Sequence, residues 1–144
     1  MIADAIRVKR DIVEEDPFEK GRRVVLNLGH TFAHTIEQVS GYAVRHGEAV
    51  AMGLVAAAHL SAALGHCDPA LQLRVEAALQ NASLPTRIPA KLPAISLYAG
   101  MGSDKKKAAG KLRFVLLRGV GDVFVTSDVP EDIVMKTLRA CGAS

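Results

Sequence analysis

Three histidines lie close together in the stretch from Leu26 to Gly53. His30, His34 and His46 all occur in LNLGHTFAHTIEQVSGYAVRHGEAVAMG, a segment that is otherwise largely apolar. Imidazole is both a zinc ligand and a proton carrier near neutral pH. Any one of these histidines, taken alone, would more often be a core residue bonded to a backbone carbonyl. Because burying three unpaired imidazoles is costly, the cluster as a whole favours a metal or proton-transfer site.

The spacing of the first two histidines fits one face of a helix. Side chains four residues apart are neighbours on a helix, with Cβ atoms about 5–6 Å apart, so His30 and His34 could converge on one ligand. His46 follows a short connection and can fold back towards them. A catalytic zinc site needs three protein ligands, so a carboxylate remains to be found. Glu37 and Glu48 are near in sequence, but either could equally face water, and neither is assigned as the ligand.

The remaining histidines and the cysteines show no comparable pattern. His59 and His66 stand alone and are interpreted as structural or exposed side chains. Cys67 and Cys141 are far apart and lack a CxxC partner, which is typical of free thiols in a reducing cytosol. None of these four residues is a site candidate.

The pattern of apolar residues predicts a mainly α fold, a helical bundle with a small β-hairpin near the C-terminus. Ala, Leu and Val dominate, aromatic residues make up only 4% of the chain and there is no Trp, which suits closely packed helices. The 46–64 helix should be buried on most sides because it is almost wholly apolar. The expected elements are helices over 2–13, 22–40, 46–64 and 69–82, a short helix after Pro93, a hairpin within 112–129 and a helix after Pro130.

Length and charge restrict the class of protein. With 144 residues, one domain is the default. The net charge of +3 comes from scattered residues, which argues against nucleic-acid binding. The chain has neither a signal segment nor an apolar run long enough to span a bilayer, so a cytoplasmic protein without membrane contact is expected. It also lacks a strand followed by a glycine-rich turn that could hold a nucleotide.

Larger blocks of the sequence resemble a known family. The stretch KRDIVEEDPFEKGRRVVLNLGHTFAHTIEQVSGYAVRHGEAVAMG, followed by GLVAAAHLSAALG and DKKKAAGKLRFVLLRGVGDVFV, is closely similar to the metal-binding half of the dehydroquinate synthases. Members of that family have an N-terminal NAD-binding α/β domain and a mainly helical C-terminal domain. The resemblance therefore implies that residues 1–144 form a single helical domain, the C-terminal portion of such an enzyme, with the NAD-binding domain absent.

The resemblance also implies roles for individual residues. His30 and His46 match the two histidine ligands of zinc, or of another divalent metal such as cobalt. His34 matches a histidine that assists proton transfer and contacts phosphate. The family's third ligand is a glutamate in a GxAExxK motif that would precede Met1, and this motif is absent from the 144 residues. Four further positions match residues that meet the substrate: Lys9, Arg23, Asn27 and Lys105.

The activity implied is that of the whole enzyme. It would convert 3-deoxy-D-arabino-heptulosonate 7-phosphate, a phosphorylated keto-sugar acid of the shikimate pathway, into 3-dehydroquinate and phosphate. NAD would be bound by the missing domain, so the isolated chain is expected to be inactive. The enzyme would be a homodimer.

Some features leave alternatives open. Ala33 occupies a position where the family usually has glycine, and Thr35 replaces a common alanine. Another NAD- and zinc-dependent sugar-phosphate cyclase, or a metal-dependent alcohol dehydrogenase, shares the histidine pattern. A folded fragment without catalytic activity is the non-enzymatic alternative.

Overall fold

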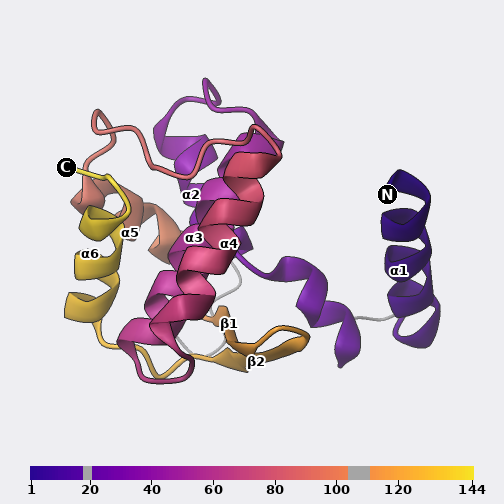
Figure 1. The fold of residues 1–144 in the computed structure, drawn as a ribbon. Coiled ribbons are helices and arrows are strands. Elements are labelled where there is room, and N and C mark those ends of the chain that lie inside the picture. The colour runs from indigo at the N-terminus through magenta and orange to yellow at the C-terminus, as the bar shows by residue number, and fades with distance from the viewer. Residues whose placement is uncertain (18–20, 104–110) are drawn as a thin grey trace.

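The computed structural model describes residues 1–17, 21–103 and 111–144, and within them the fold is mainly α, as predicted. Figure 1 shows helices gathered around α3, with the β-hairpin at one end of the group. The elements in chain order are α1 (Ile2–Glu15), the 3₁₀ helix η1 (Arg22–Asn27), α2 (His30–Val39), α3 (His46–Ala63), α4 (Pro69–Asn81), α5 (Ala94–Ser103), β1 (Phe114–Gly119), β2 (Asp122–Thr126) and α6 (Glu131–Ala140). None of the described helices is long and apolar enough to cross a membrane.

Helix α3 is the central element. It packs against α2, α4, α6 and β1, and its small side chains let these neighbours approach closely. Ala56, Ala57 and Ala58 are wholly buried, as is Leu60 one turn later. The prediction of a helix buried on most sides is confirmed.

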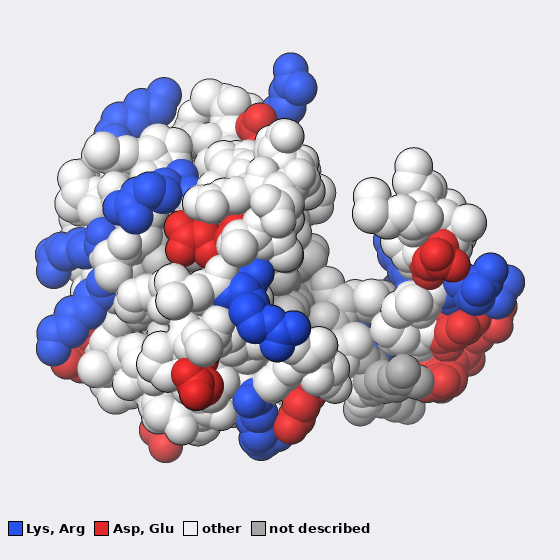
Figure 2. Space-filling model, in the orientation of Figure 1, with Lys and Arg blue, Asp and Glu red and all other residues white. Residues whose placement is uncertain are grey.

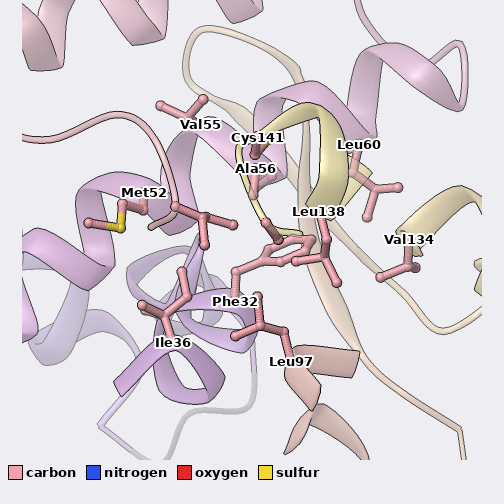
Figure 3. Close-up of a cluster of buried hydrophobic side chains, with 14 of the residues drawn as sticks. Phe32, Ile36, Met52, Val55, Ala56, Leu60, Leu97, Val134, Leu138 and Cys141 are labelled. Carbon is pink, nitrogen blue, oxygen red and sulfur yellow. The ribbon is translucent and has the colours of Figure 1, made fainter. Parts of the chain in front are cut away.

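Four helices supply the main hydrophobic core. Figure 3 shows Phe32 and Ile36 of α2 meeting side chains of α3, α5 and α6, among them Leu97 and Leu138. The ring of Phe32 lies 5.5 Å from that of Phe114 in β1, which joins the hairpin to this core. Each large apolar side chain buried in this way stabilises the fold by about 1.5–3 kcal/mol.

The hairpin and the helix that follows α3 form where their local signals predict. β1 and β2 pair antiparallel, with Phe114 opposite Thr126. Gly121 takes a left-handed φ of 75° in the turn, a conformation that favours glycine. At the start of α4, the Asp68 carboxylate accepts a hydrogen bond from the backbone N–H of Ala70 at 2.8 Å, so Asp68 is the N-cap of this helix.

The expected continuous helix over 22–40 is wrong. The chain forms the short η1, turns at Leu28 and Gly29, and only then begins α2 at His30. Gly29 has a left-handed φ of 78°, which no helix interior allows, and a Cβ there would lie 2.8 Å from the backbone of Gly53. The close crossing of α3 therefore forces the break, and only glycine fits at this point.

Helix α1 stands apart from the other helices (Figure 1) and contacts mainly η1. Within α1 only Ile12 is buried, whereas Ile2, Ile6 and Val8 are exposed. Basic and acidic side chains lie together on its surface (Figure 2), including the exposed pair of Arg7 and Asp4 at 3.5 Å. Surface pairs of this kind contribute little stability.

Candidate metal centre and active site

The first residue of α2 is His30, and its position is set by the Gly29 turn. The Nδ1 atom of His30 lies 3.2 Å from the carbonyl oxygen of Leu28. A carbonyl can only accept a hydrogen bond, so Nδ1 carries the proton and donates it. The lone pair of the His30 ring is then on Nε2, the atom left to ligate a metal.

The structure brings the three clustered histidines together. The ring centroids of His30 and His34 lie 5.6 Å apart with the planes at 90°. Those of His30 and His46 lie 6.0 Å apart with the planes at 65°, although His46 begins a different helix. Imidazoles from α2 and α3 thus meet at one point between the two helix N-termini.

His46 is held by a carboxylate. Its Nδ1 atom is hydrogen-bonded to the Oε1 atom of Glu37 in α2, which again leaves Nε2 for a ligand. The other nearby glutamate has a different partner, since Glu48 Oε2 accepts from the backbone N–H of Arg45 at 3.2 Å. Glu48 thus caps the start of α3, and its contact is with backbone rather than with imidazole.

The ligand atoms that this chain supplies fit a divalent metal. A zinc–nitrogen bond is about 2.0–2.1 Å long, so two imidazoles on one tetrahedral ion have ring centres roughly 5 Å apart. The 6.0 Å between His30 and His46 needs only a small adjustment to reach that value. Over 1–17, 21–103 and 111–144, no group of three or more His, Cys, Asp or Glu side chains is placed to hold a metal. These residues therefore offer a pair of imidazole nitrogen ligands.

Two of the cationic candidates, Lys9 and Arg23, lie on α1 and η1, elements other than those that carry the histidines. Lys9 is exposed on α1, a helix that contacts mainly η1. Arg23 is in η1, where its Nη1 donates to the Pro17 carbonyl at 2.8 Å and its backbone N–H donates to Asp16 at 3.0 Å. The structure thus anchors Arg23 on the chain that precedes η1, and Lys105 lies outside the described residues.

Asn27 and His30 belong to different elements. Asn27 is the last residue of η1 and is half-buried, and the Leu28–Gly29 turn separates it from α2.

The other histidines and the thiols lie away from this cluster. His66 packs edge-on against Phe124 of the hairpin at 4.7 Å. His59 has a buried Nδ1 atom without a hydrogen-bond partner among the described residues. Cys67 and Cys141 are free thiols, and burial raises the pKa of Cys141 to about 12, so this thiol stays protonated at neutral pH.

The contact of Glu37 with His46 is the feature that sequence reasoning missed. His30, His34 and Glu37 follow the spacing i, i+4 and i+7, which places all three on one stripe of α2. That periodicity was available as a signal for Glu37. The contact itself depends on how α2 and α3 cross, and no local pattern encodes that crossing.

Comparisons with known proteins identify the family of this chain. Residues 1–107 match a family model described as 3-dehydroquinate synthase C-terminal. A 3-dehydroquinate synthase of Xanthomonas oryzae pv. oryzae (strain PXO99A) is 49% identical over 95% of this chain. Another, of Caulobacter vibrioides (strain NA1000 / CB15N), is 46% identical over 89% of this chain. The chain spans only 39% and 36% of the lengths of these two relatives.

Solved structures show the same fold. A 2-deoxy-scyllo-inosose synthase complexed with carbaglucose-6-phosphate, NAD+ and Co2+ matches 94% of this chain with a TM-score of 0.84 and 24% identity, over 40% of its own length. ValA, a 2-epi-5-epi-valiolone synthase from Streptomyces hygroscopicus subsp. jinggangensis 5008 with NAD+ and Zn2+ bound, matches 96% with a TM-score of 0.82 and 22% identity, over 38% of its length.

Proposed function

The chain belongs to the 3-dehydroquinate synthase family, and from this premise we propose that it is the C-terminal, metal- and substrate-binding part of a 3-dehydroquinate synthase. The whole enzyme would convert 3-deoxy-D-arabino-heptulosonate 7-phosphate into 3-dehydroquinate and phosphate. It would act in the cytoplasm as a homodimer.

One observation carries the proposal. The rings of His30 and His46 come from successive helices, lie 6.0 Å apart, and each has its Nδ1 atom committed to an oxygen acceptor. Two Nε2 lone pairs are therefore available at one place, as a divalent metal requires. Zinc or cobalt would be held by His30 and His46 together with a carboxylate from outside this chain.

The chain's other residues would bind and orient the substrate. A divalent metal supplies Lewis-acid polarisation of a substrate oxygen when bound. His34, next to His30 on α2, would carry a proton to or from the substrate. Arg23, Lys9 and Lys105 would meet the phosphate and carboxylate, because guanidinium and ammonium groups form strong charge-assisted hydrogen bonds with such anions. Asn27 would bind a substrate hydroxyl.

The proposal makes the isolated chain inactive, because NAD, the hydride acceptor, would be bound by the N-terminal domain. The test compares the 144-residue chain with a fusion that adds the N-terminal part of the Xanthomonas oryzae relative. With NAD and zinc, the fusion should release phosphate from the seven-carbon substrate, whereas the isolated chain should release none. His30→Ala should abolish release by the fusion, and His66→Ala, which removes a remote imidazole, should not.

Product analysis separates the related cyclases. Mass spectrometry of the fusion's product should give 3-dehydroquinate. If the fusion instead makes a different carbocycle from another sugar phosphate, the chain belongs to a related cyclase and the assigned reaction is wrong. Phosphate release by the isolated chain, or alcohol oxidation by the fusion without phosphate release, would overturn the proposal.

A further inference from the structure

The side chain of Glu37 links α2 to the first residue of α3. It lies on the same stripe of α2 as His30 and His34, and its carboxylate meets the His46 ring at the start of α3. The His46 side chain is 65% exposed, so little packing restrains it, whereas the Glu37 side chain is only 14% exposed. An exposed ring is thus held against α2 by a largely buried carboxylate.

This contact determines which nitrogen of His46 can bind a ligand. An ionised carboxylate only accepts hydrogen bonds, so the Nδ1 atom beside it must carry the proton, and the lone pair lies on Nε2. His30 reaches the same tautomer through the neutral carbonyl of Leu28. Among the described residues, the His46 ring thus has an anion as its acceptor and the His30 ring a neutral carbonyl.

The anionic acceptor has a second effect. A hydrogen bond from imidazole to a carboxylate raises the electron density at the opposite nitrogen and makes it a better ligand for a cation. The carboxylate of Glu37, mostly removed from water, also needs a donor, so the two side chains hold each other in place. Glu48, two residues after His46, has its carboxylate on the Arg45 backbone instead.

We propose that Glu37 is a positioning residue for the metal site, fixing the tautomer and orientation of His46 so that its Nε2 atom is presented beside that of His30. This inference rests on the proposed function, because it takes His46 as a metal ligand. Glu37 itself remains on the Nδ1 side of His46 and does not bind the metal.

The experiment follows the imidazole nitrogens by ¹⁵N NMR in the 144-residue chain, first without metal and then during a zinc titration. Without metal, His46 should show a protonated Nδ1 and a bare Nε2, and Glu37→Ala should release the ring to exchange between its two tautomers. In the titration, Glu37→Ala should weaken zinc binding by about 10- to 100-fold. Glu37→Gln keeps an oxygen acceptor without the charge, so it should retain the tautomer and lose less affinity.

The matched control is Glu48→Gln, which removes the same charge close to His46 without touching the ring, and which should leave both the tautomer and zinc affinity unchanged. Urea unfolding of each variant separates a loss of folded protein from a loss of affinity. A fixed His46 tautomer in Glu37→Ala, or unchanged zinc affinity in that variant while His46→Ala weakens binding, would overturn the positioning role alone. If His46→Ala also left zinc affinity unchanged, the ligand assignment in the proposed function would fall, and this inference with it.

Discussion

The backbone of Gly53 in α3 lies directly against that of Gly29, so closely that a Cβ on Gly53 would be 2.3 Å from the Gly29 carbonyl oxygen. Gly29 is the N-cap of α2 and immediately precedes His30. The crossing of α2 and α3 is therefore fixed at the residue from which the histidine cluster starts. Both glycines are needed, because each backbone occupies the space where the other's side chain would be.

Gly53→Ala should destabilise the protein. In an unobstructed helix interior, alanine is more favourable than glycine by about 0.8–1.0 kcal/mol. At Gly53 the added methyl group would contact backbone atoms, which cannot move aside as the end of a flexible side chain can. Overpacking of this kind costs about 1–3 kcal/mol. The net effect expected in urea unfolding is a loss of stability, and the displaced start of α2 should also weaken zinc binding by His30.

Gly47→Ala in the same helix is the control for that change. In the part of the chain that the structure describes, an added Cβ at Gly47 meets nothing within 4 Å, so alanine there should be neutral or slightly stabilising. If Gly53→Ala were as stable as Gly47→Ala, the close crossing of α2 and α3 would be contradicted.

The elements with strong local signals could be predicted from the sequence. Three elements form as expected: α3, α4 and the β-hairpin. Their signals act within a few residues, and they are an apolar run in α3, the Asp68 cap of α4 and the glycines of the hairpin turn. The break before α2 could not be predicted in this way. Apolar spacing continues through Gly29, and what interrupts the helix is the backbone of Gly53, which is distant in the sequence and close only in the fold.

The candidate site also has features that local spacing predicts and features that depend on helix packing. The spacing of His30 and His34 predicts that they share a face of α2, and their rings lie 5.6 Å apart. The approach of His46 and its contact with Glu37 depend on the angle between α2 and α3, which is set by packing. The placement of α1, which carries Lys9 and contacts mainly η1, is likewise set by packing.

Thr35 and Gly100 should show strong energetic coupling. Thr35 is buried, its hydroxyl donates to the Leu97 carbonyl at 2.6 Å, and a Cβ on Gly100 would lie 2.3 Å from that hydroxyl oxygen. Gly100→Ala should therefore destabilise the protein by about 1–3 kcal/mol. With Thr35→Ala the oxygen is gone, and the next contacts of the added Cβ are 3.4 Å or longer.

A double-mutant cycle measures this coupling by urea unfolding. Gly100→Ala should cost much less in the Thr35→Ala background than in the wild type, with an interaction energy of about 1 kcal/mol or more. Additive effects of the two changes would contradict the packing of α5 on α2 around Thr35.

Ser61→Ala should loosen the hairpin from α3. The buried Ser61 hydroxyl donates to the Ala57 carbonyl at 2.6 Å and accepts from the backbone N–H of Leu117 in β1 at 2.9 Å. Alanine leaves that buried N–H without its acceptor, which costs about 1–3 kcal/mol. Hydrogen exchange at the Leu117 amide should accelerate in step with the loss of stability, whereas Ser127→Ala at an exposed position should change neither.

Cys141 should make stability fall at alkaline pH. The pKa of its thiol is raised from 9.0 to about 12, mainly by burial, with Arg87 lowering it and Glu76 adding to the rise. The folded-state pKa is above the unfolded one, so the contribution to stability is complete below about pH 9 and is lost as pH rises towards 12, by at most about 1.4 kcal/mol per pH unit. Cys141→Ala, compared with the wild type by urea unfolding across that range, should show a shallower decline. Equal slopes would show that the thiol ionises as readily in the folded chain.

His34→Ala should separate proton transfer from metal binding. His34 lies beside His30 on α2. In the proposed function His34 transfers a proton, whereas His30 and His46 bind the metal. In the fusion with the N-terminal domain, His34→Ala should lower kcat by about 10²- to 10⁴-fold, the usual contribution of a general acid or base, while zinc affinity stays unchanged. His46→Ala should reduce both quantities. A loss of zinc affinity in His34→Ala equal to that in His46→Ala would make His34 a ligand instead, since its ring is as close to His30 as that of His46.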